Sequence, residues 1–359
     1  MLYRALYTLF LQRVPPELAH TLGFWSLRII AWTSGTRALL RRLAFPADGD
    51  ALAVNALGLE FRSPLGAAAG LDKNAESFDA LGAVGFGFVE VGTITSTPQK
   101  SNPRPIIRRL PADRALLNRM GFPNRGAAAT AARLRRGSGE TIVGTNIGKS
   151  RATSIEQAAG DYRAAARLVA PYADFVVLNV SSPNTEGLRD LGTVERLEPL
   201  VVATRQELGE IPLLVKISPD LQDEEIDAVA DLAVRLGLAG IVAVNTTVDR
   251  SVLSGDGAEQ AAGFEGGGVS GRPLSRRALT VLRRLHKRVG DSLVLVSVGG
   301  IDTPADAWER ILAGATLVQA YTGFVYGGPG WPRRINRELA SRVRQAGASS
   351  IQELVGLQG

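Results

Sequence analysis

The feature that most constrains the fold of this chain is a repeated alternation of short apolar runs with longer amphipathic stretches, which begins at Leu65. Each apolar run ends at a glycine, an asparagine or another turn-forming residue, as parallel strands joined by crossover helices do. Eight such runs predict strands at residues 65–68, 88–91, 142–145, 175–178, 213–216, 240–244, 293–296 and 317–320.

Helices are predicted between and after these strands, at residues 75–81, 125–136, 155–169, 195–208, 223–235, 276–288, 304–313 and 332–346. Eight strands with eight helices favour the α/β class and a closed (β/α)8 barrel, the TIM barrel, over an open doubly wound sheet. Residues 46–359 are expected to form this barrel domain. Within it, residues 55–62 resemble a small hairpin that could close the bottom of the barrel.

Composition excludes several kinds of site. The chain has no cysteine and two histidines, so no disulfide, thiolate metal site or thiol nucleophile is possible, and no metal is expected. The net charge of +6 suits an anionic partner. No basic run with interleaved aromatic residues occurs, so a nucleic-acid surface is not expected. No leader peptide is evident at the start, which favours the cytoplasmic side.

The first 45 residues predict two helices, at 1–12 and 17–33, separated by a pair of prolines. Apolar stripes that include tryptophans are interrupted by charged residues, so neither helix could cross a bilayer. Two interpretations remain open from these residues. The helices could lie in a membrane interface, with tryptophan at headgroup depth and arginine on anionic lipid, or they could form a hairpin packed on their own domain.

Polar residues follow the predicted strands directly, where barrel enzymes place their reactive groups. They include Lys73, Thr93 and Lys216, and asparagines at Asn146, Asn179, Asn184 and Asn245, with Asn118 as a further member. An asparagine offers both a donor and an acceptor, so the set could bind a planar ring with N–H and C=O groups, such as a pyrimidine. Each asparagine alone could equally be a turn former.

The last two strands end in glycine-rich turns at Gly299, Gly300 and Gly323, and Gly271 precedes the sixth predicted helix. Loops at these positions of a barrel commonly bind phosphate through backbone N–H groups, which predicts a phosphorylated cofactor. A cation at Lys216 would stabilise the anionic N1–C2 region of a reduced flavin. Glycines that serve only as turn formers are the alternative.

These strings, at residues 69–74, 118–122, 179–185, 245–247, 267–274 and 297–301, resemble the dihydroorotate dehydrogenase family from Leu52 onward. The resemblance implies oxidation of dihydroorotate to orotate, a step of pyrimidine synthesis, with FMN as cofactor. By motif position, the residues implied for FMN are Ala69, Gly70, Leu71, Asp72, Lys73, Thr93, Asn146, Asn179, Lys216, Val244, Gly271, Gly300, Tyr321 and Thr322. Those implied for dihydroorotate are Lys73, Asn118, Arg119, Met120, Gly121, Phe122, Asn179, Asn184, Asn245 and Thr246.

The resemblance also implies a class within the family. Soluble members have cysteine as the catalytic base, and membrane-associated members that reduce a quinone have serine, which is Ser182 here. We therefore expect Ser182 to take a proton from C5 of the substrate while the C6 hydride passes to the flavin. His20, Arg109 and Tyr321 are implied on the quinone side, at the mouth of a quinone-access segment formed by residues 1–45.

The expected partners are dihydroorotate or orotate, a membrane quinone and the lipid surface, with no obligate protein partner. The expected place is the cytoplasmic face of the inner membrane, as a peripheral protein. Residues 253–268 are expected to form an exposed or mobile loop and residues 185–191 a lid. A dihydrouridine synthase acting on tRNA is the nearest enzyme alternative, although that family uses a cysteine acid, and a non-catalytic membrane scaffold is a second alternative.

Overall fold

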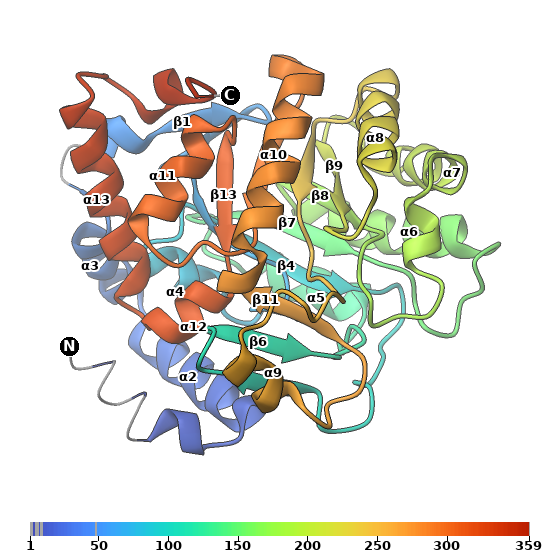
Figure 1. Ribbon diagram of the computed structural model, residues 1–359. Helices are drawn as coiled ribbons and strands as arrows, with labels where there is room; N and C mark the ends of the chain where they lie inside the picture. The colour runs from blue at the N-terminus through green and yellow to red at the C-terminus, as the bar shows by residue number, and fades with distance from the viewer. Residues whose placement is uncertain (1–2, 4–6, 8–9, 47–48, 359) are drawn as a thin grey trace.

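The computed structural model describes residues 3, 7, 10–46 and 49–358 of the chain. Eight parallel strands close into a barrel in the order β10, β12, β13, β3, β4, β7, β8, β9 (Figure 1). Their bounds are β3 (Leu65–Ala67), β4 (Phe88–Ile94), β7 (Ile142–Ile147), β8 (Phe175–Asn179), β9 (Leu213–Ile217), β10 (Gly240–Ala243), β12 (Val294–Val298) and β13 (Leu317–Ala320). All eight predicted strands are confirmed, and so is the TIM barrel.

The eight predicted helices also form. They are α4 (Phe78–Ala83), α5 (Ala127–Leu134), α6 (Ala158–Val169), α7 (Val194–Arg205), α8 (Asp223–Arg235), α10 (Ser275–Val289), α11 (Pro304–Leu312) and α13 (Trp331–Gln345). Helix α4 begins three residues later than predicted, because the carboxylate of Asp72 accepts the backbone N–H groups of Glu76 at 2.8 Å and Ser77 at 2.6 Å. Those bonds hold the preceding residues in a loop. Short 3-10 turns complete the set at η2 (Gly49–Leu52), η3 (Ala170–Tyr172), η4 (Arg189–Gly192), η5 (Arg272–Leu274), η6 (Gly290–Ser292) and η7 (Ile351–Leu354).

The lower half of the barrel is filled by aromatic rings. The predicted hairpin forms from β1 (Val54–Ala56) and β2 (Leu59–Phe61), and it places Phe61 against Phe88, with the ring centroids 5.3 Å apart. Phe88 in turn meets Phe175 at 6.1 Å. A Cβ at Gly66 would lie 2.3 Å from the Phe88 ring, so only glycine leaves room for this packing.

Three further strands form a separate antiparallel sheet that the sequence did not predict. It contains β5 (Ile107–Leu110), β6 (Ala115–Asn118) and β11 (Gly268–Gly271), with β6 in the centre. Figure 1 shows this sheet at the end of the barrel opposite the β1–β2 hairpin, beside the blue helix α2. Helices α9 (Gly255–Ala261) and α12 (Thr322–Gly327) were also not predicted.

The segment 253–268 contains helix α9, which the sequence does not predict, but most of its residues are exposed, as expected. Ser254 caps α9 by accepting the N–H of Gly257 at 3.1 Å. Phe264 is buried beside Leu117 and Val269 of the small sheet. The cap starts α9 and the Phe264 ring attaches the segment to the small sheet. That the segment is mobile remains a prediction.

The N-terminal region contains η1 (Leu11–Arg13), α2 (Pro16–Ile30) and α3 (Ser34–Ala44). Helix α2 confirms the prediction at residues 17–33, and the prediction at residues 1–12 lies mostly outside the described residues. Helix α3 was not predicted; a reciprocal capping box between Thr33 and Thr36 starts it. No helix in the described part of the chain is both long and apolar enough to span a bilayer.

Candidate active site

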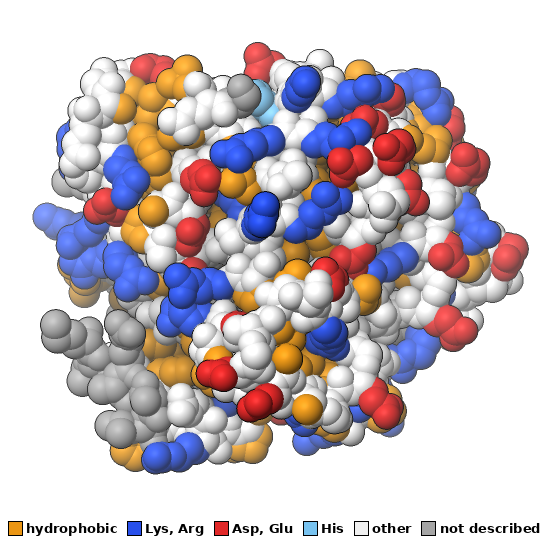
Figure 2. Space-filling view, in the orientation of Figure 1, with side chains coloured by type: hydrophobic (Ala, Val, Ile, Leu, Met, Phe, Trp, Pro, Cys, Tyr) orange, Lys and Arg blue, Asp and Glu red, His pale blue; other side chains and the backbone are white. Residues whose placement is uncertain are grey.

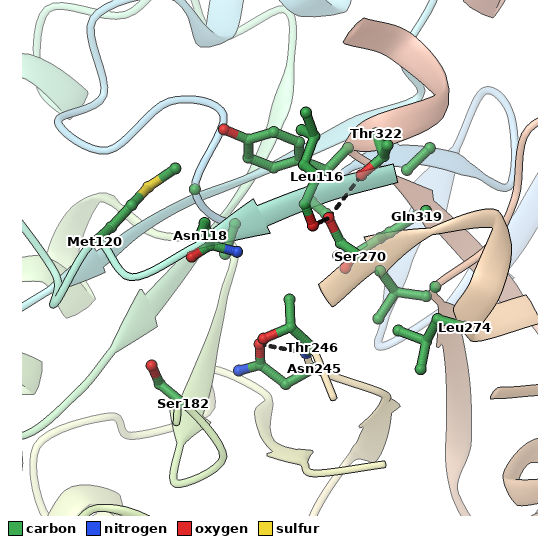
Figure 3. Close-up of a pocket in the computed structure, with 18 of the residues that line it drawn as sticks. Leu116, Asn118, Met120, Ser182, Asn245, Thr246, Ser270, Leu274, Gln319 and Thr322 are labelled. Atoms are coloured by element: carbon green, nitrogen blue, oxygen red, sulfur yellow. Dashed lines mark hydrogen bonds between the residues drawn. The ribbon is translucent and has the colours of Figure 1, made fainter. Parts of the chain in front are cut away.

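A pocket lies at the carboxyl end of the barrel strands, under the small sheet, and has an empty volume of about 1130 Å³ including open solvent at its mouth. Strand-end loops form its floor and sides, while β6 and β11 cover it. In Figure 3, Asn118 from β6 faces the same cavity as Ser182 and Asn245, which follow β8 and β10. Segments distant in sequence thus converge at one place, as the strand-end pattern predicted.

Most of the residues singled out in the sequence line this pocket. On the side assigned to the cofactor they are Ala69, Gly70, Lys73, Thr93, Asn179, Lys216, Val244, Gly271, Gly300, Tyr321 and Thr322. On the side assigned to the substrate they are Asn118, Met120, Gly121, Phe122, Asn184, Asn245 and Thr246, together with Ser182. The structure places these side chains together, and their individual roles remain predictions.

Four of the residues predicted for the cofactor or the substrate lie outside the lining. Leu71 is buried behind it, and Asp72 caps the backbone before α4. Asn146 lies one layer below the pocket and accepts a hydrogen bond from Thr93 at 2.6 Å. Arg119 points away, donating to the carbonyl of Pro105 at 2.9 Å.

Ser182 is almost completely buried, and its Oγ accepts the backbone N–H of Asn184 at 3.3 Å. The Asn184 amide donates across the pocket to Oδ1 of Asn118 at 3.2 Å. Oδ1 of Asn184 and Oγ1 of Thr246 are buried, and no hydrogen-bond partner for either lies among the described residues. Buried polar atoms without partners are costly in a folded protein, so these two are poised to bind a polar ligand.

Lys73 brings a cation to the same side of the pocket. Its Nζ donates to the carbonyl of Gly70 at 2.8 Å. Burial lowers the pKa of Lys73 to about 8, although the neighbouring Asp72 opposes that shift. The side chain is therefore a cation at neutral pH that can lose its proton in mildly alkaline solution.

The residues predicted for the quinone side gather between α2, β5 and the barrel. Nε2 of His20 lies 2.9 Å from the carbonyl oxygen of Leu71, and its ring stacks on Phe24. Burial, with a smaller effect of Lys73, lowers the pKa of His20 to about 4, so the ring is neutral near pH 7. Arg109 donates to the carbonyl of Val14 at 2.7 Å, which ties β5 to the turn before α2. Burial raises the pKa of Tyr321 to about 12.

At the end of the pocket near β12 and β13, backbone rather than side chains forms the wall. Gly300 has a φ of +80°, and a Cβ there would lie 2.3 Å from Cα of Ser275. Gly271 has a φ of +98°. Both positions require glycine and expose backbone that a phosphate could approach.

Several lining residues were missed by the sequence reasoning. Ser270 lies in β11 and hydrogen-bonds Thr322 at 2.9 Å, as Figure 3 shows, but its strand was taken for a loop. Arg114 and Asp302 form a two-bond ion pair at 2.7 Å between the small sheet and the turn after β12. Gln319 lies inside a barrel strand, where the strand-end rule does not look. These residues are identified as pocket residues only by their positions in the folded structure.

The segment predicted to be a lid is packed down in this structure. Leu188 and Leu191 are buried, and Arg189 pairs with Asp220 at 2.8 Å and donates to the carbonyl of Thr246 at 3.1 Å. That the segment opens remains a prediction. Among the described residues, no group of three or more His, Cys, Asp or Glu side chains could hold a metal ion.

Comparison with known proteins supports one family. The family model for dihydroorotate dehydrogenase matches residues 51–343. A Thermobifida fusca protein described as dihydroorotate dehydrogenase (quinone) is 55% identical over 99% of this chain and 97% of its own length. One from Mycolicibacterium smegmatis with the same description is 53% identical over 99% of both chains. The ligand-free crystal structure of the Eimeria tenella enzyme superposes with a TM-score of 0.85 at 37% identity, covering 96% of this chain and 99% of that one.

Proposed function

This chain belongs to the dihydroorotate dehydrogenase family and is a quinone-dependent oxidoreductase of that family, and on this premise we propose that its barrel pocket binds FMN and oxidises dihydroorotate to orotate with Ser182 as the base. Dihydroorotate as substrate and a quinone as acceptor follow from the family, as does a flavin cofactor. The observation that carries the site assignment is the convergence of Ser182, four asparagines and Lys216 in one pocket.

The pocket suits FMN in particular among flavins. Gly271, Gly300 and Thr322 would hold the phosphate through backbone N–H groups and a hydroxyl, and Lys216 would lie by the flavin ring. Gln319 supports this fit, because its Oε1 is buried and lacks a partner among the described residues. When bound, FMN supplies the acceptor for two electrons and a proton that dihydroorotate gives up.

Substrate would be held by the asparagine set. Asn118, Asn184 and Asn245 would donate to the carbonyl groups of the pyrimidine and accept from its N–H groups, while Lys73 would pair with its carboxylate. The free acceptor on Asn184 and the free hydroxyl of Thr246 fit this role. The packed segment 185–191 would keep water out during the transfer.

Ser182 would take the proton from C5. A serine hydroxyl is a weak base, so it must pass its proton onward. Thr185 lies three residues further along, buried, and its Oγ1 has no partner among the described residues. It is the threonine best placed for that relay.

Replacement of Ser182 tests this assignment. Ser182→Ala should slow flavin reduction by dihydroorotate by at least about 10²-fold, since general-base catalysis commonly contributes 10²–10⁴. Stopped-flow absorbance would measure both half-reactions, with Ser182→Cys as a control that restores a base. The oxidation of prereduced flavin by a quinone should stay within about twofold. Equal losses in the two half-reactions would remove Ser182 from the mechanism.

The acceptor can be tested directly. Dihydroorotate should bleach the flavin of the anaerobic protein, and a soluble quinone should restore the yellow colour. Fumarate and NAD, added separately, should not restore it. Recovery with either of those but not with quinone would contradict the proposed acceptor side.

The membrane surface completes the proposal. Helix α2 packs Phe24 and Leu27 only partly against the core. On its outer face Leu22, Trp25 and Ile29 are half or more exposed. An apolar helix face with tryptophan suits the interface of a bilayer. Residues 1–45 would then form the quinone-access segment, His20, Arg109 and Tyr321 would meet the quinone, and the protein would sit peripherally on the cytoplasmic face of the membrane.

A further inference from the structure

Glu90 is a fully buried carboxylate that the chemistry above does not use. It lies in β4 below the pocket floor, with an exposure of 0%. Nζ of Lys216, from β9 on the other side of the barrel, is 3.5 Å from Glu90 Oε1. A buried charge needs such a partner, and here the partner is the cation proposed to face the flavin.

Two amide side chains complete the surroundings of Glu90. Nδ2 of Asn146 donates to Oε1 at 2.6 Å, and Nε2 of Gln319 donates to Oε2 at 2.6 Å. With the ammonium of Lys216, three donors from three strands therefore meet one carboxylate. This arrangement fits an ionised glutamate whose acceptors are used.

The carboxylate also fixes which way each amide faces. A carboxylate accepts hydrogen bonds and donates none, so both amides must turn their NH2 groups toward Glu90 and their oxygens away. Oδ1 of Asn146 then accepts from Thr93 at 2.6 Å and from Asn179 at 3.1 Å. Oε1 of Gln319 accepts from no described residue, and Gln319 lines the pocket.

We propose that Glu90 is a positioning residue for the cofactor: it holds Lys216 in place, offsets its charge, and makes Gln319 present an acceptor to the pocket. The pyrimidine end of a flavin carries an imide N–H between two carbonyl groups. An acceptor at Gln319 and a cation at Lys216, both held by one carboxylate, match that edge. The proposal rests on the FMN site proposed above.

The charge of Glu90 has a measurable consequence. An anionic flavin ring would be stabilised by Lys216, and Glu90 weakens that effect by pairing with the ammonium, because electrostatic interactions are strong in a site that excludes water. Removing the negative charge should therefore favour every species in which the ring is anionic. Sulfite is a suitable probe, because it adds to oxidised flavin, bleaches it and leaves negative charge on the ring.

Titration of the holoenzyme with sulfite at pH 7 tests the proposal. Glu90→Gln keeps the shape but removes the charge, and it should bind sulfite at least about tenfold more tightly than the unaltered protein. Glu90→Asp keeps the charge and should stay within about threefold.

Two controls separate positioning from general stability. Ser63→Ala removes a buried hydrogen bond of 2.8 Å to Asn336, which joins the segment before β3 to α13. This bond does not involve the Glu90 contacts, so the variant should leave the sulfite affinity unchanged. If Glu90 acts through Lys216, the effect of Glu90→Gln should shrink below about threefold in a Lys216→Met background. A Glu90→Gln protein with lowered melting temperature and unaltered sulfite affinity would overturn the proposal.

A second variant keeps the test decisive if Glu90→Gln does not fold. Gln319→Leu removes the acceptor together with the hydrogen bond that Gln319 donates to Glu90, and it leaves the Glu90–Lys216 pair in place. The apoprotein should then bind FMN about tenfold more weakly, the effect of one good hydrogen bond. An unchanged FMN dissociation constant would contradict the role of Gln319. Failure of the FMN site itself gives a different result, because the unaltered protein would then be colourless.

Discussion

At the scale of single residues, Lys73 shows how burial can tune a side chain for its ligand. Its pKa of about 8 lies close to the pH of a cell, and the largest cause is loss of solvent. The ammonium is present below pH 8 and is lost as the pH rises through that value. Any anion that Lys73 binds should therefore be released in alkaline solution.

Orotate binding measures this directly, since orotate carries the same carboxylate as the substrate and undergoes no chemistry. Its dissociation constant should be steady below about pH 7 and rise about fivefold between pH 8 and pH 9, as a pKa near 8 requires. The shift in flavin absorbance on binding gives the constant. In Lys73→Arg, which stays charged, the rise should disappear; a rise of the same size there would assign the titration to another group.

Single residues also show where sequence reasoning reached its limit. Ser182, Lys216 and the asparagines were found because they follow apolar runs, where a barrel places its reactive groups. Glu90 and Gln319 lie within such runs, so they were read simply as parts of strands. Their roles can be inferred only when the barrel closes and brings Gln319 to Glu90 and Glu90 to Lys216.

At the scale of elements, helix α2 leaves large apolar side chains exposed that no contact within the described chain covers. Several of its apolar residues face outward, with Trp25 60% and Ile29 50% exposed. Figure 2 shows basic side chains over α3 and α13, at the side of the molecule where the N-terminal helices lie. An apolar face with nearby cations suits an anionic lipid surface.

The double variant Trp25→Ser/Ile29→Ser should therefore bind anionic phospholipid vesicles at least about tenfold more weakly, because burying one large apolar side chain is worth about 1.5–3 kcal/mol. Vesicle co-sedimentation would measure the loss. Val202→Ser/Val234→Ser removes similarly exposed side chains from α7 and α8 and should bind as the unaltered protein does. Equal binding by both double variants would place the lipid contact elsewhere.

The elements that were not predicted share a physical cause. Strand β5 has two arginines in the centre of its four residues, and β6 and β11 are equally short, so none shows a clear apolar period. Their pairing with each other, with Gly268 opposite Asn118, makes them strands. Helix α3 has three arginines among its eleven residues. A local cap starts it, and packing on α4 and α13, a tertiary effect, stabilises it.

At the scale of the whole molecule, a cofactor held by loops from most of the barrel strands should stabilise the entire fold. Ligand at about 100 times its dissociation constant adds about 2.7 kcal/mol to the free energy of unfolding. The apoprotein should therefore melt several degrees higher when FMN is added at that excess. Riboflavin, which lacks the phosphate, should raise the melting temperature much less.

Differential scanning fluorimetry on the apoprotein would follow both ligands. A Gly300→Ala variant serves as the control, since its Cβ would collide with Ser275 at the proposed phosphate end. It should lose most of the difference between FMN and riboflavin. Equal shifts for the two ligands in the unaltered protein would show that the phosphate is not bound there.

The C-terminal turn and helix α2 lie at opposite ends of the barrel. The last turn, η7, docks on the β1–β2 hairpin through Gln352, which exchanges hydrogen bonds with the backbone of Asn55. In Figure 1 this corner is far from α2. Protein immobilised on a sensor chip through a C-terminal tag would therefore be held at the hairpin end of the barrel, with helix α2 pointing away from the chip. If α2 binds lipid as proposed, the immobilised protein should capture liposomes from the flowing sample.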